Sequence, residues 1–310
     1  MPELPEVETI RRGLERFILN KKIISTNILC EKSFLGHTVT GKVIALRRFG
    51  KALIIDLEGG DSLMIHLRMT GQLIFDPADS RHVQSPGPAH TASARTQSPS
   101  PAAINRFAAG HPSENFLAKL PNKQTRVIIT LDSGTLYFND QRKFGFIKSI
   151  KTSEVEDDSF IKKLAKEPWQ MSKTEFYSKL QRHAKSPIKA TILDQTIICG
   201  LGNIYADEAL FAAKIHPATP SGVITEPEAE RLLAAAREVM ERSIASGGST
   251  MATYVKPDGT RGDYLEKFAQ VFRRNGTLCP RCGKAKIQKI RIAGRGTHLC
   301  PNCQREELAK

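Results

Sequence analysis

The spacing of apolar residues predicts a helix at the start of the chain, followed by many short strands. Apolar side chains recur at helical spacing over residues 5–19, and Pro5 suits the first position of a helix. Beyond this helix, short runs rich in β-branched residues are separated by glycines. The predicted strands are Lys22–Leu29, Lys42–Arg47, Ala52–Leu57, Ser62–Leu67, Gln72–Phe75, Arg126–Leu131, Thr135–Phe138 and Phe144–Ile150. A leading helix with many short strands favours a β-sandwich or a flattened barrel.

Helical spacing dominates the chain after a polar, acidic hinge at Lys151–Asp158. The predicted helices are Ser159–Ala165, Lys173–Gln181, Lys189–Ile198, Asn203–Ala213 and Glu226–Ser246. The last segment, 278–305, reads as short strands around paired cysteines. The chain is therefore predicted to be an α+β protein. Its expected units are residues 1–150, 151–277 and 278–304.

Residues 76–121 interrupt the strands of the first unit. The segment holds seven of the 17 prolines, and its middle, His82–Pro101, has almost no large apolar residues. Such a composition cannot bury enough apolar surface to order the chain. We expect a disordered surface insertion, which a fold tolerates at low cost.

The distribution of charge along the chain indicates the kind of partner that the protein binds. The 310 residues carry a net charge of +14, and residues 267–310 hold eleven Lys or Arg against two Glu. This concentration favours a polyanion, nucleic acid before membrane. No apolar run reaches the roughly 18 residues of a membrane helix, and the start lacks a signal segment. We expect a cytoplasmic protein.

Four cysteines form the strongest spacing motif. Cys279 and Cys282 are separated from Cys300 and Cys303 by seventeen residues. Two such pairs predict a tetrahedral zinc site, whereas disulfides or a redox pair fit a basic intracellular module less well. Four thiolates leave no open position, so the zinc is expected to be structural. The gap fits a β-hairpin whose tip presents Arg295 to a phosphate.

Two further positions suggest anion binding. Asn203 follows Gly200-Leu-Gly202 at the start of a predicted helix, where backbone amides favour anions. Lys189 lies near the start of the preceding predicted helix and adds positive charge. The alternative for Asn203 is an ordinary helix cap.

Apolar residues stand beside basic ones in two glycine-containing turns. Met69 lies in His66–Gly71, and Phe144 follows Arg142 in Asp140–Gly145. Apolar wedges next to Arg suit insertion into a base stack, although core positions are the alternative. Lys51, after Phe49-Gly50, is by itself an ordinary surface lysine.

The first residues offer a nucleophile. If Met1 is removed, Pro2 begins the chain with a secondary amine that can attack an aldehyde-level carbon and form an iminium. An α-amino group titrates near pH ~8, so part of it is neutral at pH 7. Glu3 could move protons beside it. The alternative is that Pro2 only helps to start the helix.

Together these motifs resemble the formamidopyrimidine-DNA glycosylases, the bacterial MutM type. The matching segments are Pro2–Thr9, Gly50-Lys51, His66–Gly71, Asp140–Gly145, Gly200–Glu208, Ser246–Thr250 and the hairpin from Arg295 to Cys303. The resemblance implies an N-terminal β-sandwich with a leading helix, a helix-two-turns-helix motif and a zinc-binding β-hairpin holding one structural Zn²⁺.

The resemblance also implies a bifunctional DNA glycosylase and AP lyase, acting as a monomer on damaged double-stranded DNA. It would excise 8-oxoguanine or formamidopyrimidines flipped from the duplex, through a Pro2 Schiff base and β,δ-elimination. Glu3 would assist sugar opening, Lys51 would donate a proton in β-elimination, and Arg295 would serve δ-elimination. Met69, Arg142 and Phe144 would fill the void, and Lys189 and Asn203 would bind phosphates. Residues 249–264 would close over the extruded base.

This chain departs from the family pattern in places. Gln141 and Lys143 stand where Pro and Arg are frequent, Arg68 stands where Gly is common, and Gln124 replaces a frequent His. One rival is the endonuclease VIII type, which takes oxidised pyrimidines; Leu4 and the Met69 set argue against it. The other is a non-catalytic zinc-ribbon DNA-binding protein, which leaves Pro2 and Glu3 unexplained.

Overall fold

The computed structural model describes residues 2–78, 106–110, 119–248 and 264–306. Its N-terminal part consists of helix α1 (Leu4–Ile18) and ten strands. These are β1 (Lys22–Ile28), β2 (Phe34–Leu35), β3 (Gly41–Phe49), β4 (Ala52–Leu57), β5 (Asp61–His66), β6 (Gly71–Pro77), β7 (Phe107–Gly110), β8 (Thr125–Leu131), β9 (Gly134–Asp140) and β10 (Phe146–Lys151).

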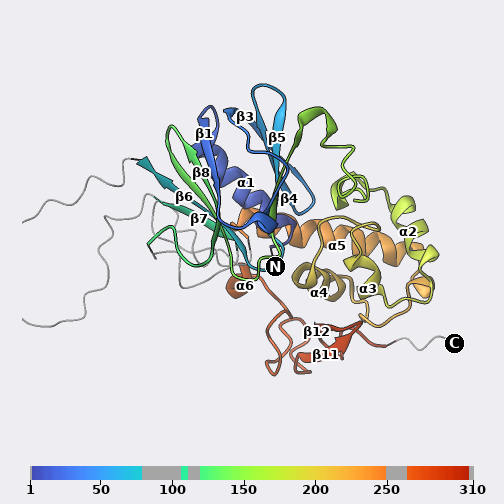
Figure 1. Ribbon diagram of the computed structural model, residues 1–310. Coiled ribbons are helices and arrows are strands. Elements are labelled where there is room, and N and C mark those ends of the chain that lie inside the picture. Colours follow the sequence, from blue (N-terminus) through green and yellow to red (C-terminus); the bar gives the residue numbers. More distant parts are fainter. Residues whose placement is uncertain (1, 79–105, 111–118, 249–263, 307–310) are drawn as a thin grey trace, which may run out of the picture.

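The strands form two layers joined at β1. The hydrogen-bonded order is β2-β10-β5-β4-β3-β1-β8-β9-β6-β7, and β1 pairs with both β3 and β8. One apolar core collects inner-face residues from both layers, such as Leu53 and Leu73, together with Leu14 of α1. Helix α1 contacts β3, β4 and β7, and Figure 1 shows it between the two groups of strands. The predicted sandwich with a leading helix is confirmed.

Two local predictions are wrong. The expected insertion at 76–121 contains β7, a buried strand that pairs with β6, and residues 76–77 belong to β6. Phe107 anchors β7 by packing its ring against Phe17 of α1, with the ring centroids 5.8 Å apart and the ring planes tilted by 40°. The helix expected at Ser159–Ala165 is a series of turns instead. The middle of the insertion, His82–Pro101, lies outside the described residues.

The second part is helical. It contains α2 (Lys173–Arg182), α3 (Ile188–Leu193), α4 (Asn203–Ala213) and α5 (Glu226–Ala245). Short 3₁₀ turns lie at Pro168–Gln170 and Ser221–Val223 in this part, and at Glu31–Ser33 and Thr152–Glu154 earlier in the chain. Helix α3 ends earlier than predicted, and residues 194–202 form the turns that join it to α4. Leu4 of α1 belongs to this second core, so the start of the chain is packed into the helical part.

The C-terminal part contains α6 (Tyr264–Lys267) and the hairpin of β11 (Gln288–Ile292) and β12 (Arg295–Leu299). A small core joins Cys279, Ile287 and Cys300 to Phe211 of α4. Arg281 lies over the Phe211 ring at 4.0 Å and donates to the Phe211 carbonyl at 2.6 Å, near the C-terminal end of α4. Among the described residues, no helix has the length and apolar character needed to cross a membrane.

Candidate nucleic-acid site

One cavity of about 1000 Å³ collects most of the predicted site residues from distant parts of the chain. Seven of the nine predicted catalytic and DNA-contacting residues line it, namely Pro2, Glu3, Lys51, Met69, Phe144, Asn203 and Arg295. Arg142 and Lys189 are not among the lining residues. The wall has five cationic side chains and one carboxylate, so the cavity is suited to an anion.

Glu3 is the carboxylate of this cavity, and its side chain is only 2% exposed. Its oxygens accept hydrogen bonds from the amides of Gly202 at 2.7 Å and Ile204 at 2.9 Å, at the N-terminus of α4. Burial raises the pKa of Glu3 to about 7, against the opposing influence of the Lys51 charge and of the amides of Ile204 and Tyr205. Glu3 can therefore hold or release a proton near neutral pH.

The Gly200-Leu-Gly202 turn lets the start of the chain approach α4 closely. A Cβ on Gly202 would lie 2.3 Å from Cδ of Glu3, and one on Gly200 would lie 2.4 Å from the Leu4 side chain. Gly200 also has a φ of +100°, which a glycine adopts without strain. These two positions need glycine so that Pro2 and Glu3 can reach the cavity wall.

Lys51 lies opposite the same turn, with 7% of its surface exposed. Its Nζ donates to the carbonyl of Leu201 at 2.5 Å, and burial lowers the pKa of the ammonium. Two side chains, Glu167 and Arg48, bind the backbone of the preceding residue, Gly50. Glu167 accepts from the amide of Gly50 at 3.0 Å, while Arg48 donates to the Gly50 carbonyl at 3.1 Å and pairs with Glu167.

Met69, Arg142 and Phe144 come together from two turns. The Arg142 Nη1 lies 3.2 Å from the Met69 sulfur, and its guanidinium lies 4.7 Å from the Phe144 ring centroid. Met69 is 41% exposed and Phe144 is 54% exposed. The alternative that these are core residues is therefore wrong, and the three form an exposed apolar cluster around one cation.

Asn203 and Lys189 both hold the C-terminal hairpin. Asn203 is the first residue of α4 rather than its cap, and its Nδ2 donates to the Gly296 carbonyl at 3.0 Å. Lys189 is fully buried, and its Nζ donates to Asp207 at 2.6 Å, Thr297 at 2.8 Å and Gly296 at 3.1 Å. Its three protons are therefore used inside the protein, and the structure does not bring this ammonium to the cavity surface.

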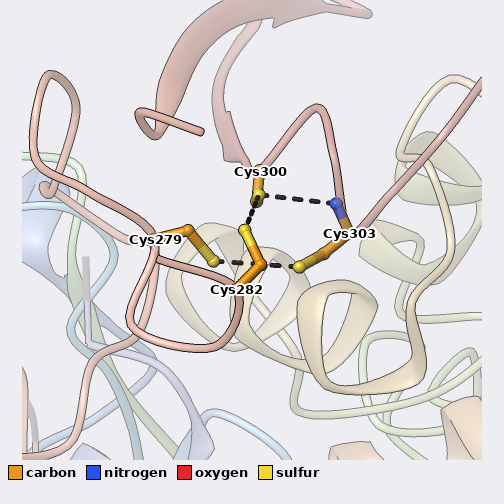
Figure 2. A group of neighbouring side chains, drawn as sticks. All are labelled: Cys279, Cys282, Cys300 and Cys303. Carbon is orange, nitrogen blue, oxygen red and sulfur yellow. Dashed lines mark hydrogen bonds between the residues drawn. The ribbon is translucent and has the colours of Figure 1, made fainter. Parts of the chain in front are cut away.

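Four cysteines converge where the hairpin begins and ends (Figure 2). The sulfurs of Cys279 and Cys303 are 3.8 Å apart, as are those of Cys282 and Cys300. Tetrahedral zinc–sulfur bonds of about 2.3 Å place sulfurs about 3.8 Å apart, so the cluster fits Zn²⁺. A disulfide needs about 2.05 Å, which these pairs do not approach. The cluster holds β12, whose first residue is the exposed Arg295.

The sequence prediction missed three acids that position these groups, the half-buried Glu167 and the buried Asp207 and Glu208. Glu167 holds the residue before Lys51, and nothing in its local sequence signals this role. Asp207 accepts from the amide of His298 at 2.9 Å, and Glu208 accepts from the amide of Phe272 at 2.8 Å. Asp207 and Glu208 stand in an otherwise apolar helix, and this contrast is a signal that the sequence does carry.

The chain matches known sequence families along most of its length. Residues 1–147 match the formamidopyrimidine-DNA glycosylase N-terminal domain, and residues 164–255 match the H2TH domain of the same glycosylase. Residues 274–305 match a zinc finger found in FPG and IleRS. A formamidopyrimidine-DNA glycosylase of Exiguobacterium sibiricum is 36% identical over 319 residues, which cover 99% of this chain and 100% of the relative. This chain belongs to the formamidopyrimidine-DNA glycosylase family.

Solved structures of the family agree with this assignment. A Lactococcus lactis enzyme in complex with a Fapy-dG-containing DNA has a TM-score of 0.78 and 32% identity, covering 98% of this chain and all of that chain. A complex of the Lactococcus lactis enzyme with abasic-site DNA gives the same TM-score and identity. Membership confirms the predicted fold, with its H2TH helices and zinc finger, and makes the chain a DNA-repair glycosylase. Of the predicted closing loop at residues 249–264, residues 249–263 lie outside the described residues, and Tyr264 begins α6.

Proposed function

We propose that this glycosylase is bifunctional, with AP lyase activity, and removes oxidised purines such as 8-oxoguanine and formamidopyrimidines from duplex DNA. The observation that carries the proposal is the shared cavity wall, where Pro2 and Glu3 lie beside Lys51 and Arg295. A nucleophile next to a carboxyl group with a pKa near 7 suits attack on a sugar carbon with proton transfer to the ring.

The reaction begins at the Pro2 nitrogen once Met1 has been removed. Its lone pair attacks the sugar C1′, the bond from C1′ to the base breaks, and the base leaves with its electron pair and takes up the proton that the Pro2 nitrogen loses. Glu3 donates a proton to the sugar ring oxygen, so the ring opens and a cationic iminium forms. The iminium then acidifies C2′, which loses a proton to solvent while the C3′–O bond breaks and the C3′ phosphate leaves in β-elimination. Loss of the C4′ proton and breakage of the C5′–O bond then release the C5′ phosphate in δ-elimination.

The remaining residues serve DNA contact. Lys51 donates a proton during β-elimination, and Arg295 binds the phosphates and assists δ-elimination. Met69, Arg142 and Phe144 fill the space that the flipped base leaves, because the exposed apolar side chains of Met69 and Phe144 are held together by the Arg142 cation. Asn203 lies at the helix start and faces the cavity, where it contacts phosphate. Lys189 supports phosphate binding through the hairpin that it holds.

One structural Zn²⁺ in the four-cysteine cluster would hold the hairpin without entering the reaction, since four thiolates leave it no open position. We propose a monomer acting on one damaged duplex. The names of the relatives favour oxidised purines over the oxidised pyrimidines of the endonuclease VIII type. A comparison of duplexes with 8-oxoguanine opposite cytosine and with thymine glycol separates these two substrate classes, and excision of thymine glycol alone would exclude our choice.

Borohydride trapping tests the covalent step. The protein is mixed with a labelled duplex containing an abasic site, and sodium borohydride is added to reduce the iminium to a stable adduct. We expect one protein–DNA adduct. Peptide mass analysis should place the attachment at the Pro2 nitrogen, which is the free N-terminal amine once Met1 has been removed. An adduct at a lysine would contradict Pro2 as the nucleophile, whereas no adduct with a preparation that binds the duplex would favour a non-catalytic DNA-binding protein.

The raised pKa of Glu3 predicts that base excision slows at high pH. Its carboxyl group keeps a proton below about pH 7, and above this pH the proton-donating fraction falls tenfold per unit. The neutral fraction of the Pro2 amine stops rising above pH ~8, so the single-turnover excision rate of an 8-oxoguanine duplex should decline above that pH. Glu3→Gln should lower the rate about 100-fold or more and remove this decline. An unchanged pH profile in the variant would exclude Glu3 as the proton donor.

A further inference from the structure

Three basic residues at the cavity have a backbone conformation that amino acids with side chains rarely adopt. Arg68, Lys143 and Arg273 have φ angles of 49°, 56° and 60°, and all three line the cavity. Glycine adopts this left-handed region freely, whereas a Cβ is strained there. Such strain persists only where neighbouring groups hold the backbone, and it gathers at functional sites. The proposed reaction gives none of these three residues a role.

Arg68 is held by the buried His66. Its amide donates to Nδ1 of His66 at 3.1 Å, and burial lowers the pKa of this imidazole to about 3, so the ring stays neutral and can accept. The guanidinium lies 5.9 Å from the ring centroids of both Phe146 and Phe160. The backbone of Arg68 is thus held by His66, and its side chain lies against Phe146 and Phe160.

Lys143 is held by the buried Asp140, which brackets it on both sides. One oxygen of Asp140 accepts from the amide of Arg142 at 3.1 Å, and the other accepts from the amide of Gly145 at 2.7 Å. The turn is therefore closed around a fully buried carboxylate, and the Lys143 side chain is exposed.

Arg273 follows a segment held by the buried Glu208. This carboxylate accepts from three consecutive amides, those of residues 270, 271 and 272, at 2.8, 3.0 and 2.8 Å. On the other side of Arg273, the amide of Arg274 donates to the Val271 carbonyl at 3.0 Å. The left-handed residue is thus fixed between two anchored neighbours, with its side chain exposed.

These three charges are available to a ligand. Within the described ranges, no carboxylate forms an ion pair with Arg68, Lys143 or Arg273. Among the described residues that line the cavity, Glu3 is the one acid, and its oxygens already accept from the amides of Gly202 and Ile204. Arg68 and Lys143 belong to the sandwich, whereas Arg273 leads into the zinc hairpin, so the three approach the cavity from two sides.

We propose that Arg68, Lys143 and Arg273 form a preorganised cationic rim that binds backbone phosphates of duplex DNA at the cavity. The rim adds contacts beyond Lys51, Asn203 and Arg295. Each residue is held in a strained conformation by its own buried acceptor, so its charge is fixed before DNA arrives. This inference rests on the proposed function, because duplex DNA is the polyanion that the cavity would receive.

The test is the salt dependence of DNA binding. Wild type and the single variants Arg68→Gln, Lys143→Gln and Arg273→Gln are titrated with a duplex carrying a tetrahydrofuran abasic-site analogue, between 50 and 200 mM salt. Each lost phosphate contact should reduce the slope of log affinity against log salt by about 0.9. The triple variant should lose about three times this amount.

Lys214→Gln is the matched control. Lys214 is also an exposed lysine with a left-handed φ of 61°, and it lies outside the cavity wall. Its variant should keep the wild-type slope. If the single variants keep the wild-type slope, or if the control variant loses as much slope as they do, the proposal that these residues bind phosphates is wrong. A wild type that neither binds the duplex nor traps with borohydride would instead overturn the proposed function.

Discussion

Blocking the Pro2 nitrogen should abolish base excision and borohydride trapping while leaving lesion-duplex binding intact. A peptide bond from a retained residue removes the lone pair that attacks C1′. We expect a fall of about 1000-fold or more, as found when an enzyme loses its covalent nucleophile. Single-turnover assays of a variant carrying one extra Ala between Met1 and Pro2 measure it.

Pro2→Gly separates the amine from the proline ring. This variant keeps a terminal amine but lacks the secondary nitrogen that forms a permanently charged iminium, so excision should be crippled and binding should survive. Normal binding in both variants shows that α1 and its contacts with α4 have formed. Full trapping by the blocked chain would show that another nitrogen is the nucleophile.

The sequence predicted regular elements best where local chemistry bounds them. Helix α4 was predicted at Asn203–Ala213 as observed, because Gly202 precedes it and apolar residues fill it. Strand β4 was also predicted at Ala52–Leu57 as observed, between two glycine-containing turns. β7 was missed because Phe107-Ala-Ala-Gly110 is a short run in a Pro- and Ser-rich segment. Only its pairing with β6 makes it a strand.

The site was harder to predict where a residue's partners come from distant segments. The motifs identified Glu3, but its raised pKa arises from burial against α4 about 200 residues later in the chain. Lys189 looked like an exposed phosphate ligand because nothing nearby in the sequence reveals Asp207 and Thr297 as its partners. Residue type and spacing predicted the chemistry, whereas burial and long-range hydrogen bonds decided how each group is used.

Helix α4 explains how parts far apart in the chain meet at one cavity. Its N-terminal amides hold Glu3, and its C-terminal end holds Arg281 of the zinc-finger segment. Between them, Asp207 binds the amide of His298 in β12, and Glu208 binds the segment before Arg273. Anions suit the start of a helix and cations suit its end, so both connections also agree with the helix dipole.

Loss of the metal should weaken DNA binding about 100-fold. Cys300→Ser removes one of four thiolates, and structural zinc contributes on the order of 10 kcal/mol to the folding of such small modules. Without the cluster, β12 no longer fixes Arg295, and the loss of its charge-assisted phosphate bonds costs about 3 kcal/mol. The affinity for an abasic-analogue duplex and the zinc content, measured together, give the result.

Cys30→Ser provides the control, because Cys30 lies outside the cluster and should affect neither quantity. The sandwich and the helical part have separate cores, so Cys300→Ser should keep the helical circular dichroism of α5 and α2. At protein concentrations that saturate the weakened complex, borohydride trapping should persist, since Pro2 and Glu3 are held by α4 rather than by the hairpin. Full affinity in a zinc-free Cys300→Ser protein would show that the hairpin is ordered without metal, and that the cluster is not what positions Arg295.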